Sequence, residues 1–125
     1  MLIAGMLALN TMHSAATQVA PDAKRGEQIY ARCTACHALT FDRVGPRHCG
    51  LFGRRAGSVT GFDYSTPMKN SKITWNDKTL DRFLTKPLEM VPGTSMTYDG
   101  VADSNDRADL IAYLKLANQS AECSK

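Results

Sequence analysis

The chain has 125 residues, the length of a single domain with a modest core. Its 15 basic and 12 acidic residues give a formal net charge of +3, too small an excess to indicate a nucleic-acid partner. With 43% hydrophobic and 7% aromatic residues, the composition is that of an ordinary soluble domain.

Residues 1–16 have the features of a secretory signal peptide. The apolar run MLIAGMLAL is too short to span a bilayer, and the small residues of HSAAT follow it. Ser14 and Ala16 occupy the −3 and −1 positions of a cleavage site after Ala16. We therefore expect a signal peptide over 1–16, a mature domain over 17–125 and export to the bacterial periplasm. No Lys or Arg precedes Lys24, so the basic segment of a signal is missing, and an ordinary buried helix is the alternative.

The first predicted helix of the mature chain covers residues 21–33, with Asp22 as a possible N-cap. Helical spacing relates the residues of its predicted buried stripe, which are Gly26, Ile29, Tyr30 and Cys33. The chain is then rich in glycine and turn residues as far as residue 62. The segment STPMKN predicts one helical turn, with Ser65 as its cap.

Two further helices are predicted in the second half of the chain. The first, in residues 76–87, has Asn76 as its cap and is expected to stop before Pro87. Its apolar residues are Leu80, Phe83 and Leu84. The loop MVPGTSMTYDG follows, and the strongest helical pattern covers residues 103–119. The apolar stripe of that helix consists of Leu110, Tyr113, Leu114 and Ala117. No segment predicts a strand or a repeat, so we expect an all-α fold.

Long irregular loops are unusual in a compact domain unless something orders them. A large, flat, apolar cofactor would supply a surface for their apolar residues. The segment ARCTACHALT contains the attachment signal of c-type haem, CxxCH, at Cys33, Cys36 and His37. On a helical turn both thiols project to one side, so that they can add to the two vinyl groups on one porphyrin edge while His37 binds the iron. We predict one covalent haem c.

Two other uses of this motif are possible. A zinc site would need two more ligands, and His48 and Cys49 are available. A CxxC redox motif would need a preceding strand in a βαβ fold, which the sequence does not predict.

The sixth position of the iron needs a soft, neutral ligand if the site is to pass electrons without binding oxygen. The methionines of the expected mature chain are Met68, Met90 and Met96. Met96 ends PGTSM in a loop, where no helical stripe explains it, but periodicity alone leaves all three as candidates.

From about Gly26 to Ala117 the chain resembles class I cytochrome c, the small soluble carriers of mitochondria and proteobacteria. The motifs that carry the resemblance occur in the family's order and are CTACH, VGP, GLFGRRAG, GFDYS, ITW, VPGTSM and RADLIAYLK. The resemblance implies three main helices, short helical turns and long loops wrapped around the haem. It implies that Met96 is the sixth ligand opposite His37, and that the carbonyl of Pro46 accepts a hydrogen bond from His37.

The resemblance also assigns the surroundings of the haem. It implies that Arg54, Tyr64 and Trp75 surround the propionates, with Thr94 hydrogen-bonded near the inner one. It further implies that Gly26 lets the first helix cross close to the last helix at Tyr113.

This chain departs from the family at several positions. Phe83 stands where a tyrosine hydroxyl commonly donates to the axial methionine, and Met68 replaces an asparagine, so the distal pocket is expected to be drier. Tyr98 replaces a phenylalanine. His48 occupies a usually apolar position and is expected to be a neutral, packed imidazole rather than a ligand. The basic residues left for docking, equally well read as a solvated surface, are Arg32, Arg55, Lys69, Lys72 and Lys86.

Two cysteines, Cys49 and Cys123, are not needed for haem attachment. In the resembled fold, the loop that holds Cys49 runs alongside the end of the last helix, so the resemblance implies a disulfide between them in an oxidising compartment. Two free thiols, or an intermolecular pair, are the alternatives.

These expectations describe a monomeric, periplasmic carrier of single electrons that is not an enzyme. Its expected partners are redox proteins: a cytochrome reductase, a terminal oxidase or a periplasmic dehydrogenase, with at most transient contact with membrane complexes and no nucleic acid. The alternative is a haem enzyme or gas-binding sensor whose sixth ligand is labile.

Overall fold

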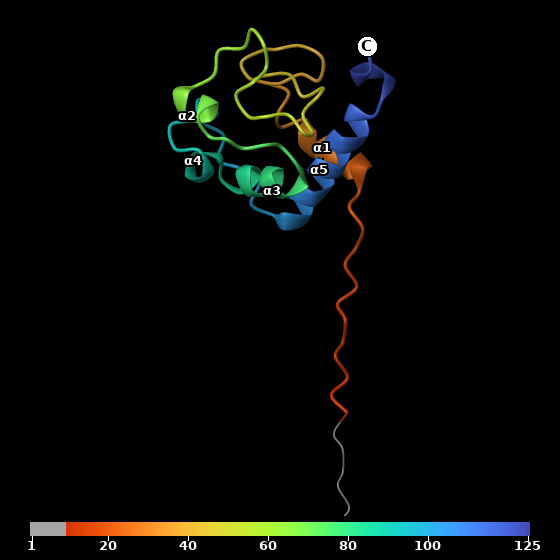
Figure 1. Ribbon diagram of the computed structural model, residues 1–125. Coiled ribbons are helices and arrows are strands. Elements are labelled where there is room, and N and C mark those ends of the chain that lie inside the picture. The colour runs from red at the N-terminus through yellow and green to blue at the C-terminus, as the bar shows by residue number, and fades with distance from the viewer. Residues whose placement is uncertain (1–9) are drawn as a thin grey trace, which may run out of the picture.

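The computed structural model describes residues 10–125, and the apolar run expected in a signal peptide lies in residues 1–9, outside the described part. Residues 10–21 run as an extended chain away from the helices (Figure 1). Within residues 10–125, no helix has both the length and the apolar character needed to cross a membrane.

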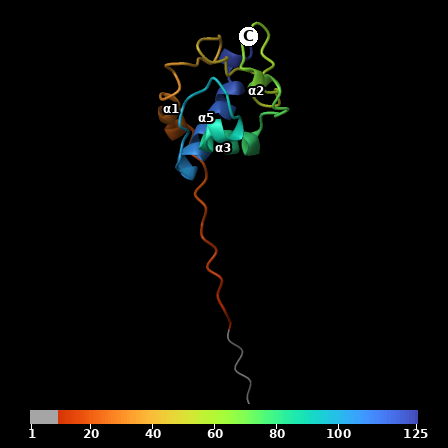
Figure 2. The same cartoon turned by 90° about the vertical axis from the view of Figure 1, so that its left-hand side faces the viewer.

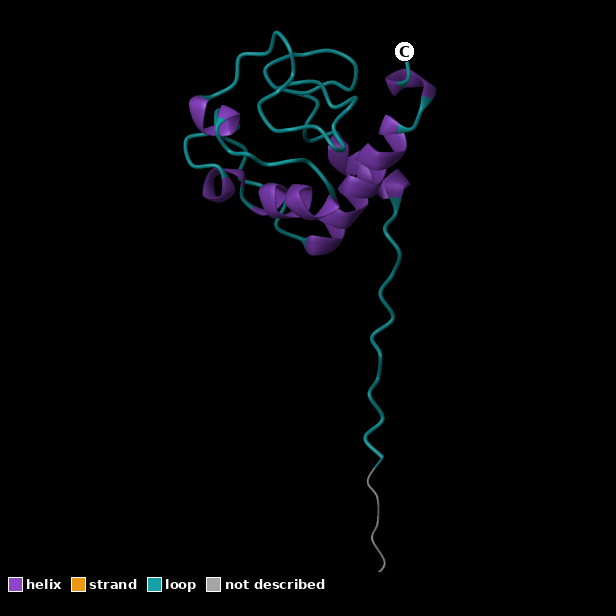
Figure 3. Ribbon diagram, in the orientation of Figure 1, coloured by secondary structure: helices purple, strands orange, loops and turns teal. Residues whose placement is uncertain are grey.

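Helices and loops make up the fold, as Figure 3 shows. The helices are α1 (Ala23–Tyr30), α2 (Thr66–Lys69), α3 (Asp77–Thr85), α4 (Pro87–Met90), α5 (Ser104–Asn118) and the 3-10 helix η1 (Ala121–Cys123). No strand occurs in residues 10–125, where a single isolated bridge pairs Arg55 with Thr74. The prediction of an all-α fold is confirmed.

The predicted N-caps are confirmed. Asp22 accepts from the backbone N–H groups at the start of α1, and Ser65 accepts from the N–H of Met68 in α2. Asn76 and Thr79 form a capping box at the start of α3. These caps satisfy N–H groups that have no partner within their own helix.

Helix α4 was not expected, because Pro87 was interpreted as the end of the preceding helix. The structure ends α3 at Thr85 and begins a new turn at Pro87. Proline suits the first position of a helix, since its missing N–H would have no helical partner there and its φ is already helical. The 3-10 helix η1 at the C-terminus was not predicted either.

Helices α1 and α5 cross in close contact (Figures 1 and 2). A Cβ atom added at Gly26 would lie 1.9 Å from the carbonyl oxygen of Asp109 and 2.8 Å from Cβ of Tyr113. Only glycine therefore fits at the crossing, and the expectation that Gly26 permits it beside Tyr113 is confirmed. The loops of residues 31–64 lie beyond this helix pair, on the side away from the extended tail in both views.

Polar contacts reinforce the crossing. The guanidinium of Arg25 pairs with both Asp106 and Asp109 of α5. The backbone N–H of Asp22 donates to Oδ1 of Asp109 at 2.7 Å. This N–H, together with Arg25, holds the pKa of the Asp109 carboxyl below its usual range.

The loop that precedes α5 is fixed by Arg107, a buried residue of α5. Its Nη1 donates to the carbonyl oxygens of Val101 and Ala102 at 2.9 and 2.8 Å, and its Nε donates to Asp81 of α3 at 2.8 Å. Arg107 therefore ties α3, α5 and the chain after Met96 together.

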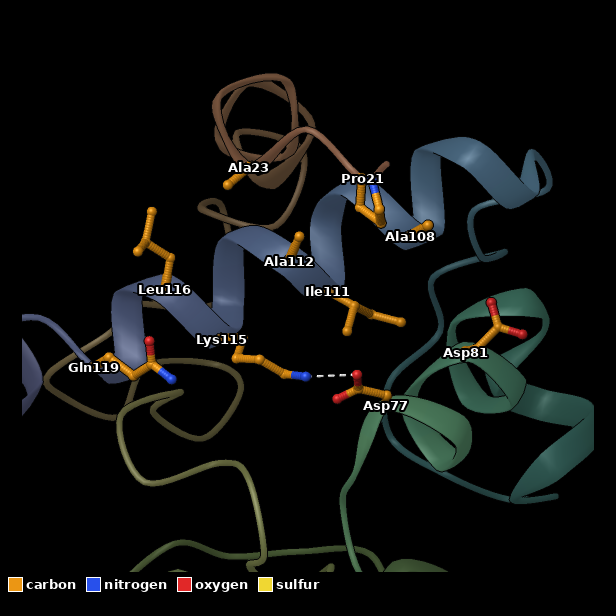
Figure 4. Close-up of a pocket in the computed structure, with 10 residues that line it drawn as sticks. All are labelled: Pro21, Ala23, Asp77, Asp81, Ala108, Ile111, Ala112, Lys115, Leu116 and Gln119. Carbon is orange, nitrogen blue, oxygen red and sulfur yellow. Dashed lines mark hydrogen bonds and ion pairs between the residues drawn. The ribbon is translucent and has the colours of Figure 1, made fainter. Parts of the chain in front are cut away.

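A shallow groove of about 520 Å³ lies between α3 and α5 (Figure 4). An ion pair between Lys115 and Asp77, at 2.6 Å, crosses it. The residues that line the groove are Pro21, Ala23, Asp77, Asp81, Ala108, Ile111, Ala112, Lys115, Leu116 and Gln119. None of these residues belongs to the predicted site.

Candidate functional site

The segment that carries Cys33, Cys36 and His37 continues directly from α1 as a series of turns. The N–H of Cys33 donates to the carbonyl of Tyr30 at 2.8 Å, and the N–H of His37 donates to the carbonyl of Cys33 at 2.8 Å. Cys33 is partly buried against the core, Cys36 is exposed, and both thiols are free. The turn geometry expected for the motif is therefore present, with both thiols available for a covalent bond.

The imidazole of His37 is held in one tautomer. Its Nδ1 donates to the carbonyl oxygen of Pro46 at 2.9 Å, the bond that the resemblance implies. In the neutral ring, Nε2 then carries the free lone pair that a metal requires. Burial is the main cause that lowers the pKa of His37, which favours this neutral form.

The edge of the same ring fits closely against Gly45. A Cβ atom built at Gly45 would lie 2.2 Å from Cε1 of His37, so any larger residue would displace the imidazole. Gly45 belongs to the VGP motif, and its N–H donates to the carbonyl of Cys36 at 2.8 Å. The loop after the cysteines therefore folds back to support His37.

His48 packs on the face of His37. The ring centroids lie 4.2 Å apart, with the planes inclined by 21°. Burial is the main cause that places the pKa of His48 well below its usual value. This direction agrees with the expectation of a neutral, packed imidazole. Within residues 10–125, no group of three or more His, Cys, Asp or Glu residues is arranged so that it could hold a metal ion.

Arg54 is anchored in the loop that contains Cys49. Its guanidinium donates to the carbonyl oxygens of Arg47 and Cys49, at 2.9 and 3.2 Å. Its backbone carbonyl accepts from the N–H of Trp75 at 2.9 Å, so Arg54 and Trp75 lie side by side. Burial lowers the pKa of Arg54.

The other predicted pocket residues are buried or partly buried. The hydroxyl of Tyr64 accepts from the N–H of Val59 at 3.2 Å. The indole of Trp75 is buried and packs on Phe83 with centroids 5.0 Å apart. Thr94 is buried, and its Oγ1 accepts from the N–H of Met96 at 3.3 Å.

All three candidate methionines contact the core. Met68 is buried, whereas Met90 and Met96 are partly buried and pack against the same cluster. Met90 is in the last position of α4, and Met96 lies in the irregular loop that follows. Burial alone therefore does not distinguish the three as a ligand.

Cys49 and Cys123 are joined as a disulfide in the structure, with Cα atoms 5.1 Å apart. The side chain of Asn118, near the end of α5, reinforces the same contact. Its Oδ1 accepts from the N–H groups of Gly50 and Leu51, at 2.7 and 3.3 Å. The loop that carries His48 is thereby fastened to the end of α5.

Acidic side chains lie near two of the basic residues expected to serve docking. Of the five expected basic residues, Arg32 lies 3.7 Å from Asp106, and Lys86 pairs with Glu89 at 3.0 Å. The apolar side chains of Phe41 and Val44 are 59% and 78% exposed. Both lie between His37 and Pro46 in the sequence. Their exposure could have been expected from the segment TFDRV, because its apolar residues fit no helical stripe.

Comparison with known proteins agrees with this geometry. A family model described as cytochrome c matches residues 23–117. Cytochrome c2 of Rhodomicrobium vannielii is 43% identical over 104 residues, which cover 81% of this chain and 83% of that protein. Cytochrome c of Cannabis sativa is 42% identical over 98 residues, covering 75% and 88%. The solved structure of cytochrome cH from Methylobacterium extorquens superimposes with a TM-score of 0.74 at 40% identity, covering 76% of this chain and 98% of that one.

Proposed function

The chain belongs to the cytochrome c family, and we propose that it carries single electrons between redox proteins of the bacterial periplasm. Members of this family carry a covalently bound haem c with iron, and the residues of this chain fit that group. The observation that carries the proposal is the His37 imidazole, which donates through Nδ1 to Pro46 and keeps its Nε2 lone pair free beside two free thiols.

Cys33 and Cys36 would hold the haem through thioether bonds. Their place on turns that continue α1 supports this role, because α1 is fixed against α5 and gives the bonds a rigid base. When bound, the haem supplies a one-electron couple between ferrous and ferric iron. Covalent attachment would keep it in place in both states.

We propose that His37 and Met96 would bind the haem iron. His37 has the required tautomer, and the N–H of Met96 is fastened to Thr94, which orders the loop that presents the thioether. The family resemblance of VPGTSM favours Met96 over Met68 and Met90. A neutral imidazole and a neutral thioether favour the ferrous state, so the potential should be high for a haem protein.

Arg54, Tyr64, Trp75 and Thr94 would form the polar surroundings of the propionates. Their partial or complete burial supports this role, because the burial of acidic groups requires compensating donors. Phe83 and Met68 add no hydroxyl or amide, and both are buried. These two side chains would therefore exclude water from their part of the pocket. They would also reorient little when the charge of the iron changes.

The location and partners follow from the same proposal. We propose that residues 1–16 direct export and are removed, which leaves 17–125 as a monomeric domain. Its partners would be a cytochrome reductase and a terminal oxidase or dehydrogenase, which exchange electrons at the exposed side of Cys36 without any bond of a substrate being made or broken. The names of the bacterial relatives, cytochromes c2 and cH, support this role.

The test is to produce the full chain together with haem-maturation machinery. We expect haem that stays attached in denaturant, a one-electron reduction, and no change of the reduced spectrum when carbon monoxide is added. Cys33→Ala/Cys36→Ala should lose the covalent haem. Rapid binding of carbon monoxide by the wild-type protein would contradict the carrier and favour a haem enzyme or gas sensor with a labile sixth ligand.

A further inference from the structure

Two neighbours hold the His37 ring: the carbonyl of Pro46 binds its edge, and the side chain of His48 lies on its face. The ring of His48 lies over it at 4.2 Å, nearly parallel, while Pro46 binds Nδ1 at 2.9 Å. A flat ring in this position opposes rotation of His37 about its Cβ–Cγ bond, because rotation would drive the two rings into each other. The hydrogen bond to Pro46 alone fixes one atom of the ring but not the plane.

His48 is itself held at both its backbone and its side chain. Its N–H donates to the carbonyl of Ala38 at 3.1 Å, one residue beyond His37. Its Nδ1 is hydrogen-bonded to the hydroxyl of Tyr30 at 3.0 Å. Tyr30 is 5% exposed, lies in the last position of α1, and packs on Tyr113 of α5 with ring centroids 5.2 Å apart.

We propose that His48 is a positioning residue for His37, and that the Tyr30 hydroxyl is its anchor. The pair connects the α1–α5 crossing to the plane of the axial imidazole. This inference rests on the proposed ligation of iron by His37, and it adds a residue that sets the orientation of that ligand.

A polar pair at this place needs an explanation beyond the filling of space. Burial of a phenol and an imidazole is costly unless each is hydrogen-bonded, whereas two apolar side chains would fill the same volume without that requirement. The hydrogen bond fixes the direction of the His48 ring, and an aliphatic side chain could not present a flat face in a fixed plane. The geometry therefore favours an orienting role.

The experiment compares the ferric holoproteins of wild type, Tyr30→Phe, His48→Leu and the double variant. The orientation of an axial imidazole determines how unpaired spin is distributed over the haem, so the haem methyl shifts in the proton NMR spectrum report it directly. We expect His48→Leu to redistribute these shifts, and Tyr30→Phe to change them in the same sense but less. The double variant should resemble His48→Leu, because the hydroxyl acts only through the His48 ring.

Tyr113→Phe is the matched control, since it removes a neighbouring hydroxyl for which the structure shows no hydrogen bond to His48. Its haem methyl shifts should equal those of wild type. Variants that unfold more easily yet keep the wild-type shifts would show a purely structural pair and overturn the inference. Equal effects of Tyr113→Phe and Tyr30→Phe would also overturn it. If the wild-type spectrum lacked paramagnetically shifted His37 ring protons, the proposal that His37 binds the iron would itself fail. The two outcomes above would overturn only the positioning role of His48.

Discussion

The Cα atoms of Cys49 and Cys123 lie 5.1 Å apart although 74 residues separate them in the sequence. Asn118 holds the same loop to the end of α5 through the N–H groups of Gly50 and Leu51. The C-terminus is therefore fastened to the loop that supports His48, beside the proposed axial ligand.

We predict that this disulfide forms in the exported protein. Alkylation of the unreduced holoprotein in denaturant should then modify neither Cys49 nor Cys123. Cys123→Ser should lower the free energy of unfolding by about 2 kcal/mol, below the roughly 4 kcal/mol that chain entropy alone gives, because the Asn118 contacts and the haem already restrain the chain. Two labelled thiols in the wild-type protein would refute the bond, and a covalent dimer on a non-reducing gel would reassign it.

Gly26→Ala should destabilise the fold strongly. The added Cβ would meet the backbone of Asp109 at 1.9 Å, and a backbone atom in the middle of α5 cannot move away without separation of the two helices. We expect a loss of about 3 kcal/mol in the free energy of unfolding, measured by denaturant titration. Glu27→Ala, on the exposed face of the same helix, is the control and should change stability little. Equal stability of both variants would contradict the close crossing.

Acid should weaken the α1–α5 contact through Asp109. The pKa of this carboxyl is lowered in the folded protein, mainly by the N–H of Asp22 and then by Arg25. A carboxyl whose pKa is lowered by folding stabilises the folded protein at pH values above its unfolded pKa of about 4. This stabilisation is lost as the pH falls through the folded pKa. Asp109→Asn should therefore be less stable than wild type near neutral pH, and the difference should shrink as pH falls below about 4.

Asp63→Asn, at an exposed position, is the control and should show no such trend. A difference between wild type and Asp109→Asn that stays constant over this range would contradict the linkage.

Electron transfer to partners should depend only weakly on salt. Arg32 and Lys86 already have acidic neighbours, which leaves Arg55, Lys69 and Lys72 of the five basic residues expected to steer docking. Steering by charge is screened as the Debye length falls to about 8 Å at physiological ionic strength. We expect slow oxidation by a mitochondrial oxidase and a shallow dependence of its rate on salt. Glu89→Lys should make both the rate and the salt dependence larger. A fast, steeply salt-dependent reaction of the wild-type protein would count against this view.

Much of the fold could be predicted because its signals are local. Asp22 and Asn76 cap helices through atoms two or three residues away, and the apolar stripes repeat at helical spacing. Helix α4 was missed because Pro87 both ends one helix and suits the start of another. The buried Arg107 was missed because its partners, two carbonyls and a carboxylate, come together only in the folded chain.

In the site, too, some features have a local sequence signal and others form only in the folded chain. The CxxCH spacing is enough to indicate haem, because the chemistry of attachment requires neighbouring residues. The stack of His48 on His37 and its bond to Tyr30 join three residues from two segments, so only the folded loop reveals them. The choice of Met96 over Met90 as the ligand rests on the family resemblance, because neither helical spacing nor burial distinguishes the two methionines.

The central claim is that His37 and Met96 ligate the iron of a covalent haem. Methionine bound to ferric iron gives a weak red absorption band, so the oxidised wild-type holoprotein should show this band at neutral pH. Met96→Ala should abolish the band, open the sixth position and sharply lower the potential, whereas Met68→Ala and Met90→Ala should keep the band. Its absence from the wild-type protein, or its loss in Met90→Ala with retention in Met96→Ala, would contradict the account.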